Sequence, residues 1–76
     1  MLNEYYVIVD LKNLTYMKDG EGVNLKEANK FDTLKQAENE IEKYDDDFNG
    51  VIYRVKEYTT IELEKAYQKG EKRWVI

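Results

Sequence analysis

Apolar and polar positions alternate with a period of two near both ends of the chain, a pattern that predicts β-strands. Residues 5–11, YYVIVDL, are rich in Val, Ile and Tyr, and both alternating sets begin apolar, which is typical of a central strand covered on both faces. After a short turn, residues 14–18 can return as a second strand. Residues 51–58 alternate again, and residues 72–76 predict a terminal strand with Trp74 facing the core.

A different period, of three to four residues, marks the middle of the chain and predicts one amphipathic helix over residues 33–44. Thr33 and Gln36 make a capping box at its start. Before this helix, Asn24 and Glu27 can cap a single helical turn. The apolar stripe of the main helix consists of Leu34, Ala37, Ile41 and Tyr44.

Residues 59–69 permit two predictions. Thr59 and Glu62 fit a capping box, and Gly70 suits the left-handed position after a helix end. We favour a second short helix because these cap signals are more specific than simple alternation. The alternative is the second strand of a hairpin, and the alternation expected of it is present in Ile61, Leu63, Lys65 and Tyr67.

Together these elements predict a single domain, residues 1–76, of the α+β class. The expected architecture is a small two-layer fold, an antiparallel sheet of three to four strands packed on one main helix, in the order β-β-α-β-α-β. No apolar run approaches the length needed to span a membrane, and the N-terminus lacks the basic and apolar regions of a signal peptide. We therefore expect a cytoplasmic protein with no membrane partner.

Several residue types on which catalysis usually depends are absent from the chain. The sequence has no histidine, cysteine or serine, so no disulfide can form and the usual proton-transfer and nucleophilic groups are missing. A carboxylate or lysine enzyme would need a buried pocket to shift the pKa of those groups, and a core built from 76 residues leaves little room for one. We expect a protein that is not an enzyme and needs no cofactor.

The net charge of −4 is distributed unevenly along the chain. Residues 32–47 contain seven acidic residues and two lysines, whereas residues 65–73 contain four basic residues and one glutamate. A globally acidic chain is repelled by nucleic acid unless a basic patch gathers on one face. The acidic segment is therefore the first place to look for a binding surface.

The motif DDDFNG, residues 45–50, resembles the first half of a calcium-binding EF-hand loop. Counted from Asp45, the oxygen ligands and the glycine fall at the expected positions, but the twelfth position is Lys56 in place of a bidentate glutamate. Residues 51–58 also alternate like a strand, whereas an EF-hand needs a second helix. We therefore interpret the motif as an acidic turn and predict no metal site, with weak calcium binding as the alternative.

The predicted helix carries carboxylates along one edge, because Glu38 and Glu42 are four residues apart and Asp45 follows three residues later. Neighbouring side chains at this spacing lie about 5–6 Å apart. The edge continues into the acidic turn, and a tyrosine beside it can serve as an anchor that buries area with little loss of entropy. The predicted binding surface consists of Glu38, Glu42, Tyr44, Asp45, Asp46 and Asp47.

A second candidate surface is basic. Tyr53 and Tyr58 lie beside basic residues in the predicted strand 51–58, and aromatic side chains next to cations can stack on bases. This alternative predicts a nucleic-acid-binding regulator that uses Arg54, Lys56, Lys69, Lys72 and Arg73.

The segments YYVIVD, YMKD, EANKFDTLKQAE and GVIYRVKEY, within residues 5–58, resemble small uncharacterised proteins of phages and prophages of Gram-positive bacteria. A leading aromatic-Val-Ile strand, a short strand, a phenylalanine before a capped helix and a closing Val-rich strand recur there. The resemblance implies an accessory gene of a mobile element, whose product binds and blocks a host protein, including nucleases of defence systems such as restriction or CRISPR–Cas. We therefore expect a non-enzymatic protein that uses its acidic surface to inhibit or redirect a host macromolecule with a basic surface.

Overall fold

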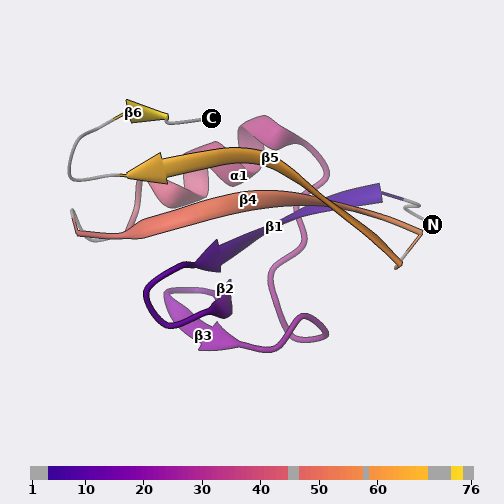
Figure 1. The fold of residues 1–76 in the computed structure, drawn as a ribbon, viewed down its shortest axis with the longest axis horizontal. Helices are drawn as coiled ribbons and strands as arrows, with labels where there is room; N and C mark the ends of the chain where they lie inside the picture. Colours follow the sequence, from indigo (N-terminus) through magenta and orange to yellow (C-terminus); the bar gives the residue numbers. More distant parts are fainter. Residues whose placement is uncertain (1–3, 45–46, 58, 69–72, 75–76) are drawn as a thin grey trace.

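The computed structural model describes residues 4–44, 47–57, 59–68 and 73–74, and in these residues one helix lies against one sheet (Figure 1). Six strands follow in the order β3-β2-β1-β4-β5-β6, and each strand is antiparallel to its neighbours. The strands are β1 (Glu4–Asp10), β2 (Thr15–Lys18), β3 (Glu21–Val23), β4 (Asn49–Lys56), β5 (Thr60–Gln68) and β6 (Arg73–Trp74), and the helix is α1 (Leu34–Ile41).

The predicted architecture is wrong in its numbers of strands and helices. The observed order is β-β-β-α-β-β-β, with six strands in place of three to four and, in the described part of the chain, one helix of eight residues. β3 and β6 are strands of only three and two residues that extend the sheet on its two sides. Such short strands carry too little periodic pattern to be recognised in a sequence. The expected position of Trp74 in the core concerns a side chain outside the described part of the structure.

The segment 59–69 does not form the favoured second helix, because most of it is the nine-residue strand β5. β5 pairs along the whole of β4, from Lys56 opposite Thr60 to Asn49 opposite Gln68. A helix cap contributes only about 1 kcal/mol, whereas this ladder pairs the backbone of all eight residues of β4. The local cap signals are therefore outweighed by tertiary pairing, and the alternative prediction of a strand is confirmed.

A β-bulge interrupts the ladder between β4 and β5. Ile52 pairs with Lys65 and Tyr53 pairs with Leu63, so Glu64 is the extra residue on β5. Because Ile52 belongs to the core on the α1 side, the bulge places Lys65 on the α1 face of the sheet. Leu63 lies on the opposite face, with Tyr53.

β1 is confirmed as a central strand, with apolar residues packed against both of its faces. On the α1 side, Ile8 and Ile52 of the sheet pack with Ala37 and Ile41 of the helix. Two thin cores therefore share one sheet, and burying each large aliphatic side chain stabilises the fold by about 1.5–3 kcal/mol. The buried residues on the opposite face are Tyr5, Val7, Val9, Ala28, Val51, Val55 and Ala66.

Residues 24–31 connect the two cores beside β1. The Asn24 side-chain oxygen accepts a hydrogen bond from the backbone N–H of Glu27 at 3.2 Å, which caps a single turn as predicted. Phe31 exchanges two backbone hydrogen bonds with Tyr6, each 2.9 Å long, and its ring packs against the core on the α1 side. The segment therefore pairs with the end of β1 that β2 does not reach.

The start of α1 has the predicted cap. The Thr33 hydroxyl accepts a hydrogen bond from the backbone N–H of Gln36 at 3.2 Å, and the Gln36 side chain accepts one from the N–H of Asp32 at 2.9 Å. The helix ends at Ile41, earlier than predicted. A tighter turn follows, in which the N–H of Tyr44 donates to the carbonyl of Ile41 at 3.0 Å. This turn keeps Tyr44 against the core on the α1 side.

Candidate functional site

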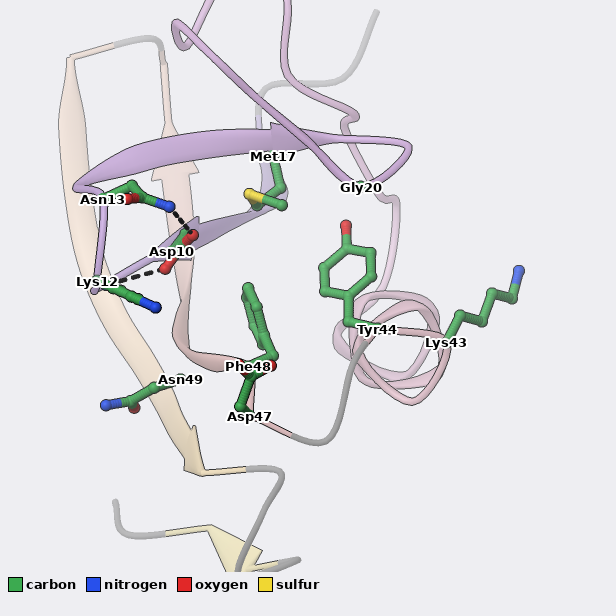
Figure 2. Close-up of a pocket in the computed structure, with 10 residues that line it drawn as sticks. All are labelled: Asp10, Lys12, Asn13, Met17, Gly20, Lys43, Tyr44, Asp47, Phe48 and Asn49. Carbon is green, nitrogen blue, oxygen red and sulfur yellow. Dashed lines mark hydrogen bonds between the residues drawn. The ribbon is translucent and has the colours of Figure 1, made fainter.

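An open depression of about 340 Å³ lies where the C-terminal end of α1 faces the turns that flank β2 (Figure 2). We call it the helix-end depression. The β1–β2 turn, the β2–β3 turn and the described residues between α1 and β4 form its walls. It is lined by Asp10, Lys12, Asn13, Met17, Gly20, Lys43, Tyr44, Asp47, Phe48 and Asn49.

Two aromatic rings form the floor of the helix-end depression. Tyr44 and Phe48 meet edge to face, with their ring centroids 4.8 Å apart and their planes at 69°, a favourable geometry for an aromatic pair. Both rings pack against the core on the α1 side, which fixes their positions. The Tyr44 hydroxyl points toward Gly20 in the β2–β3 turn (Figure 2). The floor is therefore held in place by the core beneath it.

The Tyr44 hydroxyl stays neutral at physiological pH. Burial, followed by the negative charges of Glu40 and Asp19, raises the pKa of Tyr44 to about 12. A hydrogen bond with the backbone of Gly20 lowers this pKa, but the raising effects outweigh it. A phenol with such a pKa can donate a hydrogen bond to a bound group, but it does not act as a nucleophile or a general base at neutral pH.

The two carboxylates that line the depression have different surroundings. Asp10 accepts hydrogen bonds from the backbone N–H of Lys12 and from the side-chain amide of Asn13, each 2.9 Å long (Figure 2). Asp10 therefore fixes the β1–β2 turn, in the manner typical of aspartate before a turn. Asp47, on the opposite wall, is exposed to solvent.

The C-terminal end of α1 carries negative charge, and its last turn contains no basic residue. Glu42 occupies the C-cap position and is exposed. Glu40 lies 3.3 Å from Lys43, but 74% of the Lys43 side chain is exposed, so solvent screens this pair. Because this end is the negative pole of the helix, each carboxylate here is unfavourable by about 0.3–1 kcal/mol.

The structure separates the predicted acidic edge. The Glu38 carboxylate accepts a hydrogen bond from the Lys65 ammonium group at 3.2 Å, and both side chains are partly buried. Glu38 therefore ties α1 to β5 and is not the solvated end of a continuous acidic edge. Lys65 reaches Glu38 because β5 is a strand paired with β4.

The other predicted binding residues gather at the helix end, as far as the structure describes them. Tyr44 lies in the floor of the depression, Asp47 lies on its wall, and Glu42 is exposed at the C-cap. Asp45 and Asp46 lie outside the described residues. Three of the six predicted residues are thus found at or next to one concave surface.

Phe48 and Asp10 are among the residues of this surface that the sequence analysis does not predict. Phe48 is an aromatic residue within a polar, acidic turn, and its type alone was a signal that it packs against something. Asp10 precedes Lys12 and Asn13 at the end of a strand, where an aspartate often closes a turn. Neither signal connects these residues to Tyr44, which is distant from Asp10 in the sequence.

The residues after the DDDFNG motif form β4 and not the second helix that an EF-hand requires. Packing explains Gly50, because a Cβ atom there would overlap the Phe48 ring and lie 2.7 Å from the carbonyl oxygen of Val9. Lys56, the twelfth residue counted from Asp45, ends β4 opposite Thr60. Among the residues that the structure describes, no three acidic side chains are grouped so as to hold a metal ion.

Arg54 and Lys56, the basic residues of the alternative, nucleic-acid-binding surface whose side chains the structure describes, contact carboxylates. Arg54 donates a hydrogen bond to Glu62, and its guanidinium also lies 3.0 Å from Glu64. Glu4 lies 3.7 Å from Arg54, and Lys56 lies 3.8 Å from Glu62. The hydrogen bond from Arg54, together with the charge of Lys56, lowers the pKa of Glu62. We call these five residues the Arg54 cluster.

The Arg54 cluster is a poor match for a phosphate group. Its three carboxylates surround two cations, so the cluster carries negative charge and repels an anion. Lys69 and Lys72 of the alternative surface lie outside the described residues, as does the side chain of Arg73.

Comparisons of the chain with protein-family models, curated proteins and solved structures find no match. The resemblance to phage proteins therefore stays a prediction, and the geometry of the surface is the main guide to function. Across the described part of the chain, no helix combines the length and the apolar character needed to cross a membrane.

Proposed function

We propose that the protein is a non-enzymatic binding protein that receives a basic side chain of a partner protein in the helix-end depression. The observation that carries the proposal is the negative end of α1, without a basic residue in its last turn, beside a concave aromatic floor. The resemblance to proteins of mobile elements supports a wider role in which the partner is a host protein that becomes inhibited or redirected. A nuclease of a restriction or CRISPR–Cas system, with its basic nucleic-acid groove, is a partner of this kind.

A lysine or arginine of the partner would interact with the depression in three ways. Glu42 and Asp47 attract the cation before contact, which mainly increases the association rate. The last turn of α1 presents the negative pole of the helix. The rings of Tyr44 and Phe48 provide aromatic surface for a cation–π contact of about 0.5–2 kcal/mol.

The described lining favours binding over catalysis. Tyr44 remains protonated, and Asp10 is committed to the β1–β2 turn, so they do not form a nucleophile and its base. Lys12 and Lys43 also line the depression, so positive and negative charges both surround it. A partner must therefore place its cation over the aromatic floor and near Asp47, which makes shape as important as charge.

The proposal is tested with two double variants of equal charge. Glu42→Lys/Asp47→Lys reverses the charge beside the depression, while Glu21→Lys/Glu27→Lys makes the same change at exposed residues of β3 and the following turn. Partners captured from a Gram-positive lysate are purified and their association rates measured at several salt concentrations. We expect the first variant to slow association at low salt by about tenfold or more and the second to leave the rate nearly unchanged.

Phe48→Ala sharpens the test because it removes half of the aromatic floor without changing charge. We expect it to increase the dissociation rate of the same partner. The proposal fails if both double variants bind the partner equally well, since another surface is then used. It also fails if the wild-type chain retains nucleic acid and no protein, a result that would favour the regulator alternative.

A further inference from the structure

The outer side of β5 is largely without a partner strand. Its inner side pairs with the whole of β4, whereas β6 pairs only with Tyr67 and Gln68. In the described part of the chain, residues 60–64 have no strand on their outer side, and Figure 1 shows this part of β5 extending well beyond β6. An unpaired strand edge of this length is a template for the addition of another strand.

The hydrogen bonds of the inner strands determine which backbone groups of β5 point outward. Tyr6 exchanges both of its backbone hydrogen bonds with Phe31, on the side of β1 that faces away from β4. Because antiparallel ladders alternate residue by residue, Arg54, opposite Tyr6, directs its N–H and C=O toward β5. Its partner Glu62 then directs its own groups toward β4. The residues on either side of Glu62 therefore direct their N–H and C=O groups outward, away from the sheet.

These two outward residues, Ile61 and Leu63, are also exposed apolar residues. About 45% of Ile61 and 43% of Leu63 is accessible to solvent. Both lie on the face of the sheet opposite α1, where they pair with Val55 and Tyr53. Each therefore offers an added strand two backbone hydrogen-bonding groups and an aliphatic side chain to pack against.

The α1 face of the same edge is acidic. Glu62 and Glu64 belong to the Arg54 cluster, in which three carboxylates share the two cations Arg54 and Lys56. The Glu62 side chain is 42% exposed, so a new cation can reach it. The edge thus presents aliphatic groups on one face and surplus carboxylate on the other.

We propose that the outer edge of β5 binds an extended segment of a partner protein in which aliphatic residues alternate with lysine or arginine. The backbone of the segment pairs with residues 61 and 63, and its aliphatic side chains pack on Ile61 and Leu63. Its basic side chains lie on the other face, beside Glu62 and Glu64. This is binding by β-strand addition. It uses a surface separate from the helix-end depression and does not rest on the proposed function.

A second copy of the chain is a poorer occupant of this edge. If two β5 strands pair so that their apolar residues share one face, Glu62 and Glu64 of each copy meet the same glutamates on the other face. Like charges directly opposite one another destabilise a strand pair. Charged residues on an edge strand are a common means of preventing self-association. The charge pattern therefore selects a basic segment over another β5.

The test uses the full chain and two synthetic peptides about as long as β5, one alternating lysine with valine and one alternating glutamate with valine. Binding is followed by fluorescence anisotropy and by the NMR amide shifts of the protein. We expect the lysine–valine peptide to shift the amides of residues 60–66, to leave those of residues 21–23 unchanged, and to bind more weakly as salt increases. We expect the glutamate–valine peptide not to bind.

Three variants locate the contact. Leu63→Pro removes an outward N–H group and is expected to weaken lysine–valine peptide binding by about tenfold or more. Glu62→Gln/Glu64→Gln removes the charge and is expected to weaken it by about two- to fivefold. Leu63→Ala removes only the side chain, keeps the strand backbone intact if proline disturbs folding, and is expected to weaken binding. Leu14→Ala, at a leucine of the β1–β2 turn that is 78% exposed, is the matched control and is expected to have no effect.

Three results would overturn the proposal. In the first, the lysine–valine peptide fails to shift residues 60–66 or shifts another surface. In the second, the glutamate–valine peptide binds equally well, which removes the role of charge. In the third, the protein self-associates with increasing concentration and Leu63→Ala abolishes this, which makes a second copy the occupant of the edge.

Discussion

The two sides of the sheet end in strands that differ in how far they are protected. On one side, β3 is three residues long and includes Gly22. On the other side, β5 is nine residues long, and β6 covers only its last two. A very short edge strand offers too few backbone groups to recruit another strand, whereas a long one must rely on its side chains for protection. Within the described residues, the molecule is therefore open to strand addition on the β5 side.

The chemistry that holds each side in place also differs. On the β3 side, the β2–β3 turn contacts the neutral Tyr44 hydroxyl through Gly20, and Asn29 donates a hydrogen bond to Asp19 at 3.1 Å. On the β5 side, Arg54 joins carboxylates on β1 and β5. On the β3 side, burial and the charges of Glu40 and Asp19 favour the protonated phenol, whereas the β5 side depends on ionised carboxylates. The two sides should therefore weaken at opposite ends of the pH scale.

The largest expected effect distinguishes the side of β5 that pairs with β4 from its outer side. Glu62→Pro removes an N–H group that pairs with β4, so we expect it to lower the free energy of unfolding by about 3 kcal/mol or more. Leu63→Pro removes an outward N–H group and should cost much less, about 1 kcal/mol. Urea unfolding followed by circular dichroism measures both. Equal losses would show that the assigned direction of the β5 backbone groups is wrong.

Substitutions at two glycines test how tightly each side of the sheet is packed. At Gly50, a Cβ atom would lie 2.7 Å from the backbone carbonyl of Val9 and overlap the Phe48 ring, so the backbone must move. At Gly22, a Cβ atom would lie 2.6 Å from the hydroxyl oxygen of Thr15 and 3.0 Å from its Cβ atom, so rotation of this side chain relieves the first contact but not the second. We expect Gly50→Ala to cost about 1–3 kcal/mol and Gly22→Ala a smaller amount, about 1 kcal/mol. A larger loss at Gly22, in the same unfolding measurement, would mean that the β3 side is the more tightly packed.

The parts of the fold that the sequence predicts correctly are those with a local signal. β1 and β4 are recognised by alternation and by their Val and Ile content, and the start of α1 by Thr33 and Gln36. Residues 59–69 carry helix caps and alternation together, and only the presence of β4 as a partner selects the strand. That partner is a tertiary fact, which no window of sequence around these residues contains.

The same error limits the prediction of the site. The sequence predicts Glu38 on the acidic binding edge, but its partner Lys65 lies on β5, in the segment for which the sequence favours a helix. Tyr44 and Asp47 were found because they follow directly from the helix and its turn. Asp10 joins them only through the way β1 and β2 fold around the helix end. Residues near in sequence were thus predicted, and those brought together by the sheet were not.

The response of Tyr44 to alkaline pH tests the β3 side. Its pKa is raised from 10.0 to about 12 in the folded protein, so folding favours the neutral phenol. The associated stability is fully present below pH 10 and is lost as the pH rises toward 12. After allowance for partial exposure, we expect a loss of about 1–2 kcal/mol. The free energy of unfolding of Tyr44→Phe should not show this alkaline loss. A tyrosinate absorbance titration in which the variant and the wild-type chain give the same curve would contradict the raised pKa of Tyr44.

The smallest expected effect is the response of the β5 side to acid, because the Arg54 cluster is exposed to water. Arg54 lowers the pKa of Glu62 below its ordinary value of 4.5, so the stabilisation is complete above that pH and is lost as the pH falls through the lower folded-state value. Glu62→Gln has no titrating carboxylate at this position, so its free energy of unfolding should fall less than that of the wild-type chain as the pH is lowered through this range. Urea unfolding at several acidic pH values measures the difference. If both chains lose the same free energy of unfolding, the ionised Glu62 does not hold the β5 side, and the surplus charge expected to select a basic segment is of little consequence there.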